Sequence, residues 1–192
     1  MSKYEDIRCR GISNPNPWKG RVPVLVGAWH TGTEPALNLA KYAEDIGADG
    51  VVLIPPFFKK VESKIYLYEH FSRIAGRVNL PIMIQDNEEA FGIHICTSLY
   101  ERLAEEHSNI YLVKIEGVGA IEKMRQIREL MQDRMIIFGG SAARFFYEEM
   151  AVGARGNIPD ACLPDLLAEV FNRYKMATWR AQGGYTTGSN VG

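Results

Sequence analysis

Lys114 is the residue of this chain whose possible chemistry follows most directly from its surroundings. It lies near the end of an apolar, β-branched run, Asn109-Ile-Tyr-Leu-Val-Lys-Ile115, which predicts a buried strand. An ammonium group in such a place costs free energy unless an anion pairs with it, and burial favours the neutral amine. A neutral lysine amine attacks carbonyl carbon. The run therefore suggests a Schiff-base lysine, although a lysine whose stem packs on apolar surface while its amine reaches water is the simpler interpretation.

Two carboxylates follow neighbouring predicted strands. Asp86 and Glu116 come at the carboxyl ends of these strands, where barrel enzymes place their catalytic groups. Either residue could transfer protons or bind a sugar hydroxyl, or could simply neutralise Lys114 or accept from local backbone. The pleat predicts that Lys114 shares an inward face with Leu112 and Glu116, and that Asp86 points away if Gln85 faces inward.

A glycine-rich turn is the third candidate. Gly139-Gly-Ser141 precedes a predicted helix and could offer free backbone amides to an anionic or hydroxylated group, or could be an ordinary strand-to-helix turn. The histidines do not suggest a metal site, because none of them forms an H-x-x-x-H or H-E-x-x-H pattern. They are His30, His70, His94 and His107.

Alternating strand and helix patterns position these residues. We predict strands at 22–27, 50–54, 81–86, 110–115, 135–138 and 156–159, and helices at 34–46, 62–78, 98–106, 120–131, 144–152 and 163–177. Apolar strands that each precede an amphipathic helix indicate a parallel sheet covered by helices. Thr33 is a candidate N-cap and Gly47 a candidate left-handed C-cap of the first helix. Six such units fit either a (β/α) barrel or an open doubly wound sheet, but the first β/α turn, Gly27-Ala-Trp-His-Thr-Gly32, lacks the dinucleotide-binding fingerprint.

Composition narrows the class of protein. The chain has 192 residues, 46% of them hydrophobic, so it is large and apolar enough to bury a core. Its net charge of −1 gives no electrostatic reason to expect binding to nucleic acid or to an anionic membrane. Cys9, Cys96 and Cys162 are widely spaced, which predicts free thiols in a reducing compartment. No apolar run approaches the length of a membrane span, and we expect a soluble, cytoplasmic protein.

We predict an irregular arm at 1–20, one domain at 21–181 and a disordered tail at 182–192.

The stretch 20–181 resembles the dihydrodipicolinate synthase / N-acetylneuraminate lyase family, the class I, Schiff-base pyruvate-type aldolases built on a (β/α)₈ barrel. Gly20-Arg-Val-Pro-Val-Leu-Val-Gly27 is similar to the family's third strand, and segments 49–58, 80–85, 109–114, 138–141 and 153–158 are similar to its fourth to eighth strands. The resemblance implies an α/β fold of the TIM-barrel type that is incomplete, with about six β/α units corresponding to strands 3 to 8.

The resemblance also implies a site. Lys114 occupies the position of the family's Schiff-base lysine, and Ile158 the position whose backbone carbonyl faces substrate. We predict that Gln85, Glu116, Gly140, Ser141 and Ile158 bind substrate. The substrate would be a 2-oxo acid or sugar-acid derivative, no metal or organic cofactor would be needed, and the chain would form a homo-oligomer.

Several positions depart from the family pattern. The family's first two β/α units, with the glycine and threonine loop that binds a 2-oxo acid's carboxylate, do not fit within the arm before Gly20. Gln85 replaces the family's proton-relaying tyrosine, and a glutamine amide cannot serve as a general acid. Asn87-Glu-Glu-Ala-Phe91 lacks the arginine that binds the second substrate in the synthase branch, so we do not expect lysine-pathway synthase activity.

Three hypotheses follow. The first is a Schiff-base lyase, of the aldolase or dehydratase type, that uses Lys114. The second is a truncated or inactive family member that acts as an interaction protein, or a fragment, because six strands cannot close an eight-stranded barrel and leave unpaired edges. The third is a different barrel or open α/β enzyme that binds phosphate at the Gly139 turn.

Overall fold

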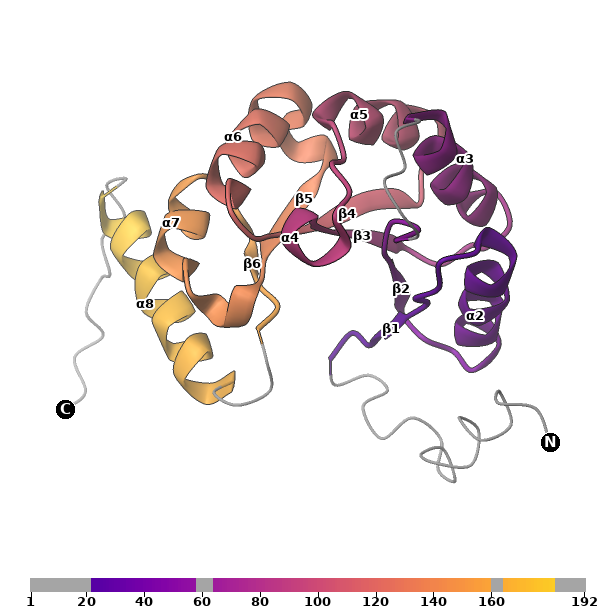
Figure 1. The fold of residues 1–192 in the computed structure, drawn as a ribbon. Coiled ribbons are helices and arrows are strands. Elements are labelled where there is room, and N and C mark those ends of the chain that lie inside the picture. The colour runs from indigo at the N-terminus through magenta and orange to yellow at the C-terminus, as the bar shows by residue number, and fades with distance from the viewer. Residues whose placement is uncertain (1–21, 58–63, 160–163, 182–192) are drawn as a thin grey trace.

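A parallel six-stranded sheet forms the centre of the chain (Figure 1). The computed structural model describes residues 22–57, 64–159 and 164–181. The strands are β1 (Leu25–Gly27), β2 (Gly50–Leu53), β3 (Ile82–Asn87), β4 (Ile110–Glu116), β5 (Ile136–Gly139) and β6 (Gly156–Asn157). The helices are α2 (Thr33–Asp45), α3 (Lys64–Ala75), α4 (Glu88–Phe91), α5 (Thr97–Glu106), α6 (Ala120–Met131), α7 (Phe146–Ala151) and α8 (Pro164–Ala181), with 3₁₀ turns η1 (Gln132–Arg134) and η2 (Ser141–Ala143).

The order of the strands decides between the two predicted architectures. Each strand pairs in parallel with the next one along the chain, in the order β1-β2-β3-β4-β5-β6. A doubly wound sheet would reverse its strand order at a switch point, whereas a (β/α) barrel keeps chain order. Figure 1 shows the sheet as an open arc with the helices along its convex side. The prediction of an incomplete barrel is therefore confirmed, and an open doubly wound sheet is excluded.

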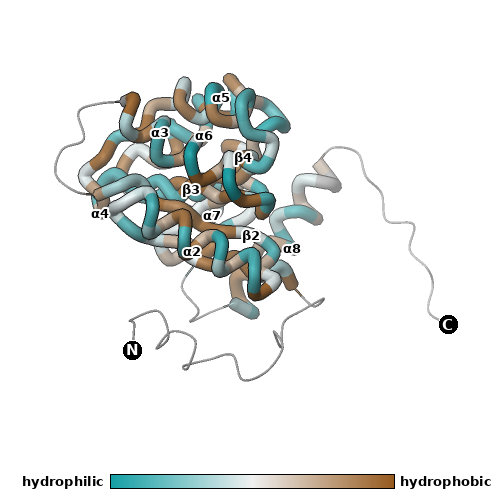
Figure 2. The backbone as a smooth tube through the Cα atoms, turned by 90° about the vertical axis from the view of Figure 1, so that its right-hand side faces the viewer, coloured by the Kyte–Doolittle hydropathy of each residue, from teal (hydrophilic) through white to brown (hydrophobic). Residues whose placement is uncertain are grey.

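The hydrophobic core lies between the convex face of the sheet and the helices. Alternate strand residues point into it, and the side chains of Leu53, Ile84 and Val113 are fully buried there. Leu103 from α5 and Ile127 from α6 cover them as members of the same cluster. Figure 2 shows hydrophobic and hydrophilic residues alternating along α2 and α5, as expected for helices that bury one face.

Most local predictions of structure are confirmed to within four residues at each end. All six strands and the six longer helices form. Gly47 adopts a left-handed conformation with φ of 75°, immediately after Ile46, the C-cap of α2. The short α4 and the two 3₁₀ turns were not predicted. The capping role of Thr33 was wrong, because Gly32 is the N-cap and the Thr33 hydroxyl instead lies 3.0 Å from Nδ1 of His70.

The described residues correspond to the central segment predicted as one domain. The predicted arm at 1–20 and tail at 182–192 lie outside them, and the domain boundaries stay predictions. Among the described helices, none has the length and apolar character needed to cross a membrane.

Candidate active site

Lys114 and Glu116 form an ion pair on the concave face of β4. They are two residues apart on one strand, so both side chains point to the same side of the sheet. The Lys114 Nζ lies 3.2 Å from Oε1 of Glu116, and the two side chains are only 13% and 9% exposed. Val113, which precedes Lys114, and Ile115, which lies between the two, are buried against the helices, as the alternation of side chains along a strand predicted. The lysine is thus neither snorkelling to solvent nor an unpaired charge.

Gln85 holds the second oxygen of the same carboxylate. It lies opposite Lys114 in the register of β3 and β4, and its Nε2 donates to Oε2 of Glu116 at 2.6 Å. The Gln85 side chain is almost completely buried. A glutamine here cannot relay a proton, but it orients the carboxylate that stands beside the lysine amine.

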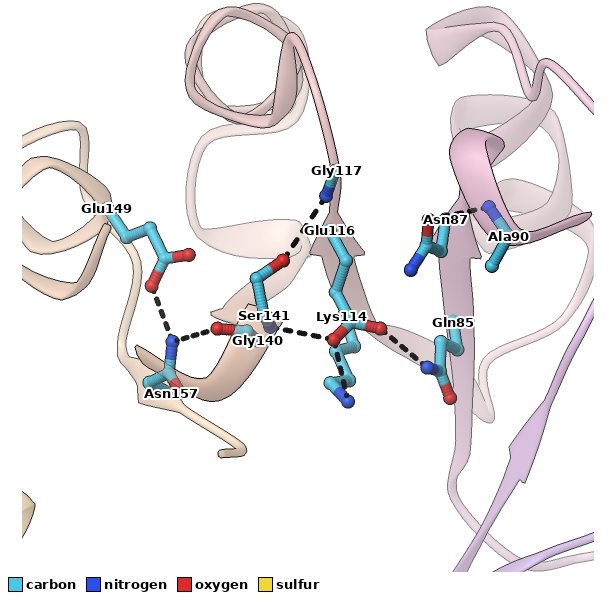
Figure 3. A network of polar contacts seen from close by, with 10 residues as sticks. All are labelled: Gln85, Asn87, Ala90, Lys114, Glu116, Gly117, Gly140, Ser141, Glu149 and Asn157. Carbon is cyan, nitrogen blue, oxygen red and sulfur yellow. Dashed lines mark hydrogen bonds and ion pairs between the residues drawn. The ribbon is translucent and has the colours of Figure 1, made fainter. Parts of the chain in front are cut away.

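The turn after β5 holds the first carboxylate oxygen. The backbone N–H of Ser141 donates to Oε1 of Glu116 at 2.8 Å (Figure 3). A Cβ on Gly140 would overlap the same carboxylate, so only glycine permits this approach. Ser141, Ala142 and Ala143 all have positive φ, between 50° and 61°, a strained conformation for residues other than glycine.

Of the two interpretations that the sequence left open for this turn, that of free amides is wrong. The Ser141 N–H is taken by Glu116, and the Gly140 N–H by the carboxylate of Glu149. The anions bound at this turn are therefore two side chains of the protein itself, Glu116 from β4 and Glu149 from α7. This removes the basis for the hypothesis of a phosphate site at the Gly139 turn.

Glu149 and Asn157 were missed from the sequence. Asn157 Nδ2 donates to Oε2 of Glu149 at 2.6 Å and to the Gly140 carbonyl at 3.1 Å, which connects α7, β6 and the turn after β5. Glu149 is 1% exposed, and this burial raises the pKa of its carboxyl group. Nothing in the sequence marks Glu149 among the acidic residues of its helix, since only the fold shows that it lies beneath Gly139.

Asp86 points away from Lys114, as the pleat predicted. Its buried carboxylate accepts from the Tyr100 hydroxyl at 2.6 Å and lies 2.5 Å from Nζ of Lys123. Burial, followed by the nearby Asp86 charge, raises the pKa of Tyr100 well above its ordinary value. Asp86 therefore belongs to the helical layer behind the sheet, and Glu116 alone of the two carboxylates reaches the lysine.

Ile158 lies at the edge of this group. Its backbone N–H donates to the Gly139 carbonyl at 3.0 Å, and its side chain is partly exposed. The predicted contact of its carbonyl with substrate stays a prediction. In the part of the chain that the structure describes, no group of three or more histidine, cysteine, aspartate or glutamate residues could hold a metal ion.

Comparisons with known proteins show to which family the chain is similar. Residues 13–175 match the model of the dihydrodipicolinate synthetase family. A 4-hydroxy-tetrahydrodipicolinate synthase from Aliarcobacter butzleri is 30% identical over 193 residues, which cover 100% of this chain and 62% of that protein.

Solved structures show the same similarity. The dihydrodipicolinate synthase of Aquifex aeolicus superposes with a TM-score of 0.77 at 27% identity, covering 85% of this chain and 55% of that one. The enzyme of Acinetobacter baumannii, solved in complex with pyruvate, gives a TM-score of 0.75 at 28% identity over 86% of this chain and 56% of that one. The chain thus spans little more than half the length of the proteins it matches. On the extent of the family match and the identity to a curated member, the chain belongs to the dihydrodipicolinate synthetase family.

Proposed function

We propose that this chain forms a Schiff base between Lys114 and a 2-oxo acid or sugar-acid derivative, and acts as a lyase of the aldolase or dehydratase type. One observation carries the proposal. The Lys114 amine is paired at 3.2 Å with a carboxylate whose two oxygens are separately held by Gln85 and by the Ser141 amide. A held carboxylate beside a lysine amine is what proton transfer during imine formation requires.

Glu116 would act as the base and then as the acid. It would first accept a proton from the Lys114 ammonium, leaving a neutral amine that attacks the substrate carbonyl carbon. It would then return a proton to the carbinolamine hydroxyl, which leaves as water while the imine forms. The protonated imine draws electrons from the adjacent carbon and so promotes C–C cleavage or dehydration. Glu116 would thereby replace the tyrosine that the family carries at the position of Gln85.

The surrounding residues would bind the substrate. We propose that Gly140, Ser141 and Ile158 line its path at the carboxyl ends of β5 and β6, and that Gln85 and Glu116 contact its polar groups. The absence of a side chain at Gly140 lets the Glu116 carboxylate approach the turn, and the Ile158 side chain is partly exposed. We further propose a cytoplasmic protein that assembles as a homo-oligomer and needs no organic cofactor.

Borohydride trapping tests the proposal directly. Reduction of the protein in the presence of pyruvate should add the mass of one reduced pyruvate to the peptide that contains Lys114. A K114R variant should gain no such mass, while a K123R variant should behave like the wild type, because Lys123 is paired with Asp86 behind the sheet.

The opposite result would favour the second hypothesis. If neither pyruvate nor a panel of longer 2-oxo acids and sugar acids is trapped on Lys114 in folded protein, the chain is an inactive family member. The same outcome in protein that gel filtration shows to be aggregated would instead direct attention to the open edges of the sheet.

A further inference from the structure

We propose that Glu149 is a positioning residue that holds the Gly140–Ser141 turn in place, so that the Ser141 amide can orient Glu116 beside Lys114. The inference rests on the proposed function of Lys114 and adds a residue to it. Glu149 lies on α7 and would act on Glu116 only through the turn.

The carboxylate of Glu149 is bound on two sides. It accepts from the backbone N–H of Gly140 and from Nδ2 of Asn157, the latter at 2.6 Å. Asn157 uses its amide a second time, donating to the Gly140 carbonyl at 3.1 Å. Both backbone polar groups of Gly140 are therefore held by the Glu149–Asn157 pair, and the next residue supplies the N–H that binds Glu116. Figure 3 shows the contact of Glu149 with Asn157, that of Asn157 with the Gly140 carbonyl, and those of Glu116 with the Ser141 amide and with Lys114.

The backbone is shaped around both carboxylates. A Cβ on Gly139 would overlap the Glu149 carboxylate, and a Cβ on Gly140 would overlap that of Glu116. Consecutive glycines thus admit one glutamate each, from α7 on one side and from β4 on the other. The strained run of positive φ values begins at the next residue, Ser141. Strain of this kind persists only where surrounding contacts over-determine the backbone, and Glu149 supplies such contacts.

Charge near Glu149 supports a role beyond packing. Burial is the largest cause of the raised pKa of its carboxyl group, and the charges of Glu116 on β4 and of the exposed Glu148 on its own helix add to the effect. The Glu116 charge is in turn offset by Lys114. Burying a carboxylate costs more free energy than burying an apolar side chain of similar size. A role in packing alone would therefore not require a glutamate at this position.

The test uses an isosteric variant and a neighbouring control. E149Q keeps the side-chain shape but loses one of two acceptor oxygens, so it should loosen the turn. E148Q removes a carboxylate from the adjacent, exposed position on the same helix. We expect the rate of pyruvate trapping on Lys114 to fall about 10- to 100-fold in E149Q, as for other small misplacements of catalytic groups, and to stay at the wild-type value in E148Q.

A second readout does not depend on the substrate. The amide proton of Ser141, bound to a carboxylate, should resonate at low field in the wild type and in E148Q, and should move to higher field in E149Q. A role in packing alone would lower the thermal midpoint without moving this resonance. If the wild type traps no 2-oxo acid, the proposed function fails, while the Ser141 resonance still decides the positioning role.

Asn157 provides an independent variant. Should E149Q not fold, N157A removes the same bridge from β6 and should reduce trapping and shift the Ser141 amide in the same directions. The proposal would be overturned if folded E149Q showed the wild-type rate of trapping and an unmoved Ser141 resonance. If E149Q is unfolded, the same two results in N157A would overturn it.

Discussion

Lys114 and Glu116 lie on the same face of one strand, with Nζ and Oε1 3.2 Å apart. Their spacing of two residues makes this contact a property of the strand itself, because alternate side chains of a strand point the same way. What the strand cannot provide is the orientation of the carboxylate, which comes from Gln85 on β3 and from the Ser141 amide after β5. The pair is thus a local feature held in place by two non-local bonds.

Replacing Glu116 by glutamine should impair imine formation. E116Q keeps the shape of the side chain but can no longer accept and return a proton, so we expect trapping of pyruvate on Lys114 to slow by about 100-fold or more. The rate of borohydride-dependent mass gain measures this effect. E122Q serves as the control, because Glu122 is an exposed partner of Arg125 on α6. An unchanged rate in E116Q would exclude Glu116 as the proton-transfer group.

A methyl group on Gly140 should displace the Glu116 carboxylate. The Cβ of G140A would overlap that group, so we expect a loss of about 1–3 kcal/mol in the free energy of unfolding together with slower trapping. Urea denaturation measures the first and mass spectrometry the second. G76A is the matched control, since a Cβ on Gly76 meets nothing closer than the Ser72 carbonyl at 3.4 Å. Wild-type stability and trapping in G140A would show that the turn adapts without cost.

His70 should make the protein less stable in mild acid. Burial lowers the pKa of His70 from 6.5 to about 4, with the Ile54 carbonyl opposing part of the shift. The unfolded chain therefore binds a proton between these values that the folded chain does not. Stability contributed by the neutral ring is present above pH 6.5, falls as the pH is lowered toward 4, and amounts to about 3 kcal/mol for a shift of this size.

The H70Q variant tests this dependence. Its free energy of unfolding should change less between pH 6.5 and pH 4 than that of the wild type. H94Q should retain the wild-type dependence, because His94 is an exposed partner of Glu88. Parallel curves for the wild type and H70Q would mean that His70 does not stay neutral in the folded protein.

Removing the Asp86 charge should destabilise the fold without acting on the lysine directly. D86N leaves the Lys123 ammonium largely buried without its anion and weakens the bond from Tyr100, so we expect a loss of about 3–5 kcal/mol. D165N, at an exposed position in the first turn of α8, should unfold like the wild type. A trapping rate per folded molecule close to that of the wild type would confirm that Asp86 lies outside the catalytic group.

The sequence by itself determined the order of the elements, the parallel sheet and the face on which Lys114 and Glu116 lie. These are consequences of short-range periodicity, which places apolar residues every second position in strands and every third or fourth in helices. It also indicated that Asp86 would point away from Lys114, because Gln85 and Asp86 are adjacent on one strand. The resemblance to a known family indicated the barrel and suggested the role that we propose for Lys114.

Tertiary structure alone decided which partners the key groups have. Thr33 contacts His70 instead of capping its helix, and the amides after Gly139 bind Glu116 and Glu149 instead of standing free. Glu149 and Asn157 joined the site only when α7 and β6 packed against the turn. Hydrogen bonds between residues far apart in sequence depend on how strands and helices approach one another in space. No local pattern encodes that approach. Lys114 could therefore be proposed as a nucleophile from the sequence, whereas the contacts that orient the carboxylate beside it could not be predicted.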